Sequence, residues 1–575
     1  MKPLFHLNKY LIKYKWHLLL GFVFIIFSNL FKVYMPAVVD QAADEISIFF
    51  EDYDSNKDNI EDVKNKLWDS GLKLSLIYLI YALISGLFLF LTRQSIIVMS
   101  RNIEYDLKNE IFDHYQSLSM SFFKKNNTGD LMNRISEDVG KVRMYLGPAI
   151  MYTINVFVLF IMVITFMFNK NAALTVYVLA PLPILSFLIY KISFVINKKS
   201  EKTQLQQSVL STFVQEAFSG IRVLKAYNRE EYFQGNFNTE TENYKRASLS
   251  LAFVNSFFLP AIVLLIGLST ILTIYIGGIK TINNEIDYGD ILQFVFYINL
   301  LTWPFASIGW VTSLIQRAAA SQKRINEFLI QNEKIENLNS SIEMDEITSI
   351  SFNKVFFKYE QTNIKALNDI SFNLNKGQTL GVIGRTGSGK STIANLICRL
   401  YDIHNGSIHI NAKEIQNHNL YNLRAKIGYV PQDVFLFSDT IKNNILFGFE
   451  NDNISEELVI NAAKQAQIHE DIMLFPDNYN TKIGERGITL SGGQKQRISI
   501  ARALIRKPDV LILDDCLSAV DTETEDKILK NLYSTIKSNI SVIIGHRISS
   551  VSSADQILVL ENGCIIENGN HADLI

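Results

Sequence analysis

The chain has 575 residues, too many for a single hydrophobic core, and its formal net charge is −2. Because this charge is near zero and no basic stripe with interleaved aromatic residues occurs, nucleic acid is not an expected partner. The three cysteines lack metal-binding spacing, so neither a structural metal nor a disulfide framework is expected. Hydrophobic residues make up 48% of the chain and concentrate before residue 320, which predicts two unlike halves.

The beginning of the chain is basic and amphipathic, and no small-residue cleavage site follows the first apolar stretch. This pattern predicts a helix in the membrane interface rather than a removed signal peptide. Lys2, Lys9, Lys13 and Lys15 precede that stretch, whereas residues 42–70 after it are rich in Asp and Glu. Since positive charge favours the cytoplasmic side, the N-terminus is expected to be cytoplasmic and the acidic loop external.

Six apolar stretches are long enough to cross a bilayer, and three of them carry no formal charge. They predict an all-α six-helix transmembrane domain over residues 1–330, followed by a linker at 331–347 and a cytoplasmic domain at 348–575. The six expected spans are Trp16–Val39, Leu72–Val98, Leu146–Phe168, Ala172–Ile196, Leu251–Gly278 and Ile291–Ile315.

Two connections on the cytoplasmic side are long, at residues 99–145 and 197–248. Both continue a helical period with polar faces, so the membrane helices are expected to extend well into the cytoplasm. The external connections after the third and fifth spans are short.

The cytoplasmic domain contains the glycine-rich motif GRTGSGKST at Gly384–Thr392, between the apolar run Leu380–Ile383 and a helical pattern. Such a loop turns backbone N–H groups and a helix N-terminus toward phosphate oxygens. A simple glycine turn before a helix is the alternative reading of the motif taken alone. The expected ATP ligands in the loop are Gly384, Thr386, Gly387, Ser388, Gly389, Lys390, Ser391 and Thr392.

A second buried strand is predicted at Val510–Leu513, and Asp514 follows at its carboxyl end. A carboxylate at the edge of a sheet, facing a phosphate loop, suits a partner of Mg²⁺. We therefore expect Ser391 and Asp514 to hold Mg²⁺ in an α/β P-loop NTPase domain.

The motif LSGGQ at Leu490–Gln494 separates this chain from other P-loop proteins. With it, the chain resembles ATP-binding cassette (ABC) transporters over essentially its whole length. The resemblance implies that Tyr359 stacks on adenine, that Gln432 is the Q-loop glutamine and a ligand of Mg²⁺, and that His546 contacts the γ-phosphate.

In this family two cassettes enclose two ATP molecules, so LSGGQ faces the ATP of the opposite cassette. The resemblance therefore assigns the partner-chain ATP to Ser491, Gly492, Gly493, Gln494 and Asp521, the last in the motif SAVD. Since one chain carries one cassette, a working unit is expected to contain two chains.

The long cytoplasmic and short external connections resemble those of ABC exporters. Residues 122–139 and 215–231 resemble the two coupling segments of such exporters, in which short helices carry cassette closure to the membrane helices. A solvated helical face is the alternative reading of both segments. TKIGERG at residues 481–487 resembles a loop found in exporters.

One residue departs from the pattern of most relatives, because Asp515 stands where they have the glutamate that polarises the attacking water. Aspartate is shorter by about 1.5 Å, and proton abstraction needs contact at about 3 Å. We expect the chain's own site, with Asp515, His546 and Gln432 as catalytic residues, to bind ATP but hydrolyse it slowly.

An Asp at this position resembles one half of heterodimeric exporters, most closely the multidrug-resistance-like (Mdl-type) half-transporters. The sequence thus predicts ATP-driven export of a small amphipathic molecule, drug-like or lipid, across the cytoplasmic membrane. A heterodimer is favoured over a homodimer. A regulatory ATP-binding subunit and a homodimeric lipid flippase are the alternatives.

Overall fold

The protein is seen in a computed structural model, in which the chain divides into two compact units. The first comprises Met1–Gln116 and Gly129–Gln331, and the second comprises Ser117–Thr128 and Asn332–Ile575. The structure describes residues 2–575 except 56–59, 333–334, 336–343, 361, 450–454, 485–489, 518–521 and 537.

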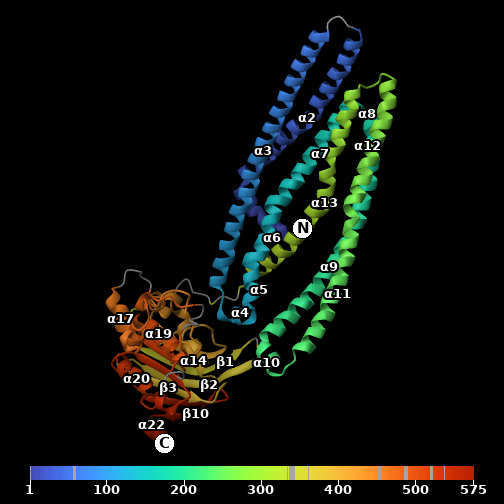
Figure 1. The fold of residues 1–575 in the computed structure, drawn as a ribbon. Helices are drawn as coiled ribbons and strands as arrows, with labels where there is room; N and C mark the ends of the chain where they lie inside the picture. Colours follow the sequence, from blue (N-terminus) through green and yellow to red (C-terminus); the bar gives the residue numbers. More distant parts are fainter. Residues whose placement is uncertain are drawn as a thin grey trace. The chain divides into compact units, whose positions relative to one another are not determined.

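The first unit is built from long helices, drawn in blue to yellow-green in Figure 1. The helix α3, Ile60–Ser117, has 58 residues, which corresponds to about 87 Å at 1.5 Å per residue. A bilayer core is about 30 Å thick, so such a helix extends far beyond it. The neighbouring helix α2, Lys15–Ser55, has 41 residues. The expected projection of membrane helices beyond the bilayer is consistent with these lengths.

The remaining helices of this unit include two short ones at the N-terminus, where an interfacial helix was expected. Helices α9 and α11 run side by side as an antiparallel pair joined through the short α10 (Figure 1). The bounds are η1 Lys2–Leu7, α1 Asn8–Lys13, α7 Ile150–Lys170, α8 Ala172–Leu179, α9 Pro181–Ser219, α10 Ile221–Ala226, α11 Glu230–Ser256, α12 Phe258–Ile282 and α13 Tyr288–Leu329.

Within the described residues, five helical segments are long and apolar enough to cross a membrane. They contain the first, second, third, fifth and sixth expected spans. The fourth, residues 172–196, falls on α8 and the beginning of α9, where four side chains lie outside the described set. The six-span count and the domain limits at 330 and 348 therefore remain predictions.

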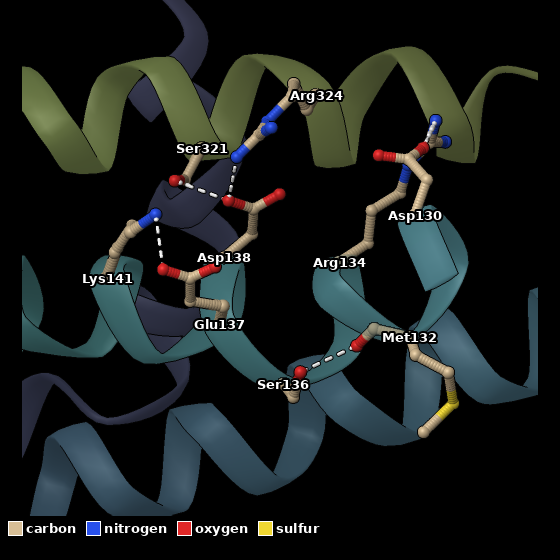
Figure 2. A network of polar contacts seen from close by, with 9 residues as sticks. All are labelled: Asp130, Met132, Arg134, Ser136, Glu137, Asp138, Lys141, Ser321 and Arg324. Atoms are coloured by element: carbon tan, nitrogen blue, oxygen red, sulfur yellow. Dashed lines mark hydrogen bonds and ion pairs between the residues drawn. The ribbon is translucent and has the colours of Figure 1, made fainter. Parts of the chain in front are cut away.

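A polar cluster joins the segment after residue 128 to the end of α13 (Figure 2). Here the chain runs through α5, Thr128–Asn133, the π-helical turn η2, Arg134–Asp138, and α6, Val139–Met144. Asp138 is 1% exposed and accepts hydrogen bonds from Ser321 Oγ, at 2.7 Å, and from Arg324. Since π-helical turns place side chains out of the α-helical period, η2 can direct Asp138 to α13.

We expect Asp138→Asn to lower the free energy of unfolding by about 1–2 kcal/mol, because Ser321 and Arg324 would then donate to a neutral amide oxygen in place of a charged carboxylate. Glu137→Gln is the matched control, since Glu137 is 63% exposed and pairs only with Lys141 one turn away among the contacts drawn in Figure 2. Thermal unfolding of the detergent-purified chain should separate the two variants. Equal melting temperatures would contradict this role of Asp138.

Among its described residues, the second unit contains two β-sheets. A four-stranded antiparallel sheet has the order β2-β1-β4-β5, and a six-stranded sheet has the order β10-β9-β3-β8-β7-β6. In the larger sheet all neighbouring pairs are parallel except β10 with β9. The strands are β1 Ser349–Tyr359, β2 Ile364–Asn375, β3 Thr379–Gly384, β4 Asn405–Ile410, β5 Lys413–Glu414, β6 Ile427–Val430, β7 Val510–Asp514, β8 Ile540–Gly545, β9 Gln556–Glu561 and β10 Cys564–Gly569.

The central strands β7 and β8 of the larger sheet are buried on both faces, as in parallel sheets that carry helices on each side. In β7, Val510 and Ile512 join one hydrophobic cluster, whereas Leu511 and Leu513 join a second. The α/β prediction is confirmed. The helices of this unit are α4 Met120–Lys125, α14 Lys390–Ile397, α15 Leu420–Ala425, α16 Ile441–Leu446, α17 Glu456–Gln465, α18 His469–Met473, α19 Gly492–Leu504, α20 Thr522–Ile536, α21 Ile548–Val551 and α22 His571–Leu574, with 3-10 turns η4 Ile415–Asn417 and η5 Asn478–Asn480.

Candidate functional site

The glycine-rich loop joins β3 to α14, as expected for a phosphate-binding loop. Gly389 has a φ of 100°, and an added Cβ would lie 2.2 Å from the carbonyl oxygen of Ala366. Only glycine fits this position, which allows the chain to turn directly into α14. Lys390 begins that helix and is 6% exposed, and its Nζ donates to the carbonyl oxygens of Gly384, at 2.8 Å, and Arg385, at 2.9 Å.

Two observations favour a phosphate ligand in this loop. Ser388 is 4% exposed, and its Oγ is buried without a hydrogen-bond partner. Burial also lowers the pKa of Lys390, as for an ammonium removed from water. A bound phosphate would supply an acceptor for the hydroxyl and a counter-charge for the lysine, so the residues present fit ATP. Thr386, Gly387 and Thr392 complete the expected loop.

The two expected magnesium ligands meet at the end of β7. Ser391 Oγ donates to Asp514 Oδ1 at 2.9 Å, and Asp514 is 2% exposed. Burial raises the pKa of the Asp514 carboxyl, and the hydrogen bond from Ser391 opposes that shift. Tyr429, on the neighbouring strand β6, also donates a hydrogen bond to Asp514. A hydroxyl beside a carboxylate is a set of hard oxygen donors that fits Mg²⁺.

The three expected catalytic residues meet around Asp515, which directly follows Asp514. Gln432 Nε2 donates to Asp515 Oδ2 at 3.0 Å, and His546 Nε2 lies 3.7 Å from the same oxygen. Gln432, which was also expected to contact Mg²⁺, thus bonds to Asp515 here. Asp515 has a φ of 47°, in the left-handed region that aspartate tolerates better than most residues.

Tyr359, the expected adenine platform, is the last residue of β1. Its hydroxyl lies 3.1 Å from Thr392 Oγ1, and its ring packs edge-on against Tyr401 with centroids 5.5 Å apart. The Nζ of Lys124, in the segment Ser117–Thr128 that belongs to this unit, lies 4.8 Å from the ring centroid of Tyr359. The sequence did not single out Lys124, because its contact partner is more than two hundred residues away.

The SGGQ residues open a different helix, α19. Ser491 caps it, since its Oγ accepts from the backbone N–H of Gln494 at 3.3 Å, and Gln494 Oε1 accepts from the N–H of Ser491 at 3.0 Å. This reciprocal cap holds the backbone of Gly492 and Gly493 in the first turn, with Ser491 and Gly492 exposed. The remaining expected residue of this set, Asp521, lies outside the described residues.

Comparisons with known proteins agree with this architecture. Residues 18–305 match the family model described as ABC transporter transmembrane region, and residues 367–518 match the model described as ABC transporter. The chain belongs to the ABC transporter family. It is an ABC half-transporter, with membrane and ATP-binding domains fused in one chain, and its fold, ATPase class and multi-pass membrane location with a cytoplasmic ATP-binding domain are confirmed.

Relatives of this ABC chain include the "Probable multidrug resistance ABC transporter ATP-binding/permease protein YheI" of Bacillus subtilis, 37% identical over 82% of this chain and 81% of the relative. The "Multidrug resistance-like ATP-binding protein MdlA" of Buchnera aphidicola subsp. Baizongia pistaciae is 36% identical over 88% of this chain and 87% of the relative. The solved structure of a bacterial Atm1-family ABC exporter with ATP bound is 24% identical in sequence to this chain. The match covers 97% of this chain and 96% of the exporter chain with a TM-score of 0.77, which shows that the fold is shared.

Proposed function

We propose that the protein exports a small amphipathic molecule, drug-like or lipid, across the cytoplasmic membrane as one half of an ABC dimer whose own ATP site hydrolyses slowly. The observation that carries this proposal is the combination in one cassette of a complete phosphate loop, a complete SGGQ cap and Asp515 in place of the usual glutamate. The names of the relatives YheI and MdlA, which refer to multidrug resistance, support a drug-like cargo.

In this proposal ATP binds to the loop from Gly384 to Thr392, with its adenine on Tyr359. Lys390 turns from its own loop carbonyls to the phosphates, and Ser391, Asp514 and Gln432 hold Mg²⁺. Mg²⁺ held by these residues would neutralise charge that develops on the phosphates. His546 contacts the γ-phosphate from the end of β8.

Asp515 takes the proton of the attacking water, but it does so from a poor position. Its carboxylate is already in contact with the Gln432 amide and lies beside the His546 imidazole. A side chain one methylene longer could keep these contacts and still approach the water. Since general-base catalysis depends on such contact, we infer slow hydrolysis at this site.

The cap of α19 serves the ATP of the second chain. Its first-turn N–H groups and the helix dipole offer partial positive charge to a phosphate, and Ser491 and Gly492 are exposed to receive it. A different chain with a glutamate base is the favoured partner, because it would supply the fast site that this chain lacks. A homodimer with slow turnover is the alternative.

Two cytoplasmic segments fit the role of coupling helices. The segment Ser117–Thr128, which contains α4, belongs to the ATP-binding unit although it interrupts the membrane unit in sequence. The short α10 presents exposed apolar side chains, with Val223 at 63% and Tyr227 just after it at 76%. We infer that α4 engages the cassette of its own chain and that α10 engages the cassette of the second chain.

A chain-resolved assay tests the unequal sites. A photoactivatable azido-ATP, radiolabelled at either the α- or the γ-phosphorus, crosslinks to the chain whose Tyr359 region holds the adenine. The ratio of γ- to α-label on this chain then falls as its own bound ATP is hydrolysed. Slow loss of γ-label on this chain, together with ATP-dependent uptake of a lipophilic cationic dye by inside-out vesicles, would support the proposal.

The alternative of a regulatory ATP-binding subunit predicts a different result in the same vesicles. Such a subunit would bind the labelled ATP normally, yet dye uptake would continue at the rate set by other proteins when this chain is removed. A loss of uptake on removal, restored by the purified chain with its partner, would exclude the regulatory role.

A further inference from the structure

The helix α20 carries two glutamates in opposite surroundings. The side chain of Glu523 is 80% exposed and pairs with Lys527 one turn away, at 2.7 Å. The side chain of Glu525, two residues further, is only 3% exposed. Because burial of a carboxylate is costly unless its charge is compensated, the position of Glu525 calls for a specific partner.

That partner is Arg547, whose Nη1 lies 3.0 Å from Glu525 Oε2. Arg547 directly follows His546 in the turn after β8. The same turn is held by Ser550 Oγ, which donates to the carbonyl oxygen of Arg547 at 2.8 Å. At Gly545 an added Cβ would lie 2.8 Å from Ser550 Oγ, so the turn is closely packed before His546 as well as after it.

The second carboxylate oxygen, Glu525 Oε1, is buried and has no hydrogen-bond partner. Glu525 lines a cavity of about 70 Å³ whose other polar walls include Asp515, His546 and Arg547. A water molecule needs about 10–15 Å³ of such space and two or more polar partners. The cavity therefore has both the room and the groups to hold water beside the carboxylate.

We propose that Glu525 is a positioning residue for His546, which it holds beside Asp515 through the Arg547 ion pair and through water in this cavity. The inference rests on the proposed contact of His546 with the γ-phosphate. It adds that the correct placement of the imidazole depends on a carboxylate from α20. The glutamate itself touches neither ATP nor the attacking water.

Glu525→Gln keeps the shape of the side chain and removes its charge. In the chain-resolved assay we expect it to slow the loss of γ-label on this chain by about tenfold, since misplacement of a catalytic group by about 1 Å can cost up to about 10² in rate. The initial α-label, which reports ATP binding, should be unchanged. Glu523→Gln, on the exposed side of the same helix, should behave as the wild type.

The decisive comparison adds Glu525→Gln to a His546→Ala chain. If Glu525 acts through the imidazole, it should cause no further slowing there, whereas equal slowing in both backgrounds would overturn the proposal. Wild-type rates with Glu525→Gln alone would overturn it too. Each of these variants is made both in the wild-type chain and in a chain with Asp515→Glu. The difference in rate between these two backgrounds tests the proposed weak base independently of the role of Glu525.

If Glu525→Gln fails to fold, a second variant tests the proposal. Removing one partner of a buried ion pair destabilises a protein more than replacing both, so this second variant is the double substitution Glu525→Gln, Arg547→Met. It should fold and show the same tenfold slowing with normal α-label. A double variant that hydrolyses at the wild-type rate would contradict the positioning role.

Discussion

Replacing Asp515 by glutamate is expected to speed hydrolysis of the ATP bound to this chain by about 10–100-fold, because the longer side chain brings the base within reach of the water. Few single changes are expected to raise an activity, so the direction of the effect is itself diagnostic. The measurement is the rate at which γ-label disappears from this chain in the chain-resolved assay. A rate equal to or below the wild-type rate would contradict the role of side-chain length.

The same substitution should lower the free energy of unfolding. Asp515 has a φ of 47°, and the left-handed region is less favourable by about 1–2 kcal/mol for residues other than Gly, Asn and Asp. A slightly lower melting temperature together with faster hydrolysis is therefore the expected pair of results. Asp515→Asn is the control, since it keeps the backbone preference and removes the base, and it should hydrolyse no faster than the wild type.

Replacing Gly492 by aspartate is expected to lower ATP turnover by the assembled transporter by at least about 10²-fold. The carboxylate would stand at the first turn of α19, where loss of a preorganised electrostatic contact to the developing charge costs about 10²–10³. An acidic residue at this end stabilises a helix by about 0.3–1 kcal/mol, so α19 should remain folded. The measurement is steady-state phosphate release.

Gly492→Asn is the matched control for this charge, because asparagine has nearly the same shape as aspartate and is neutral. It should lose much less activity than the aspartate variant. Azido-ATP labelling of this chain's own ATP site should be normal in both variants, since its phosphate loop opens α14 rather than α19. Equal losses in the two variants, or a loss of this chain's own labelling, would contradict the assignment of SGGQ to the second ATP.

The parts of the fold that local pattern governs could be predicted from the sequence. The apolar run Leu380–Ile383 lies within β3 and Val510–Leu513 lies within β7, because strands of a parallel sheet are buried on both faces and read as continuous apolar runs. Five expected spans coincide with long apolar helices within the described residues.

Contacts between distant segments could not be predicted in this way. Tyr429 and Lys124 contact site residues, and Glu525 contacts Arg547 beside His546, only because the fold brings separate strands and helices together. The sequence alone does not indicate which of the two glutamates of α20, Glu523 or Glu525, is buried. The π-helical turn that directs Asp138 to α13 has no simple sequence signature either.

The proposed inequality of the two ATP sites is tested most directly in the wild-type transporter, with both chains followed in one chain-resolved experiment. We predict that this chain keeps its γ-label while the chain whose ATP meets Ser491 and Gly492 loses it, since in the proposal Asp515 is a poor base and the partner supplies a glutamate. Loss of γ-label from both chains at the same rate would contradict the account.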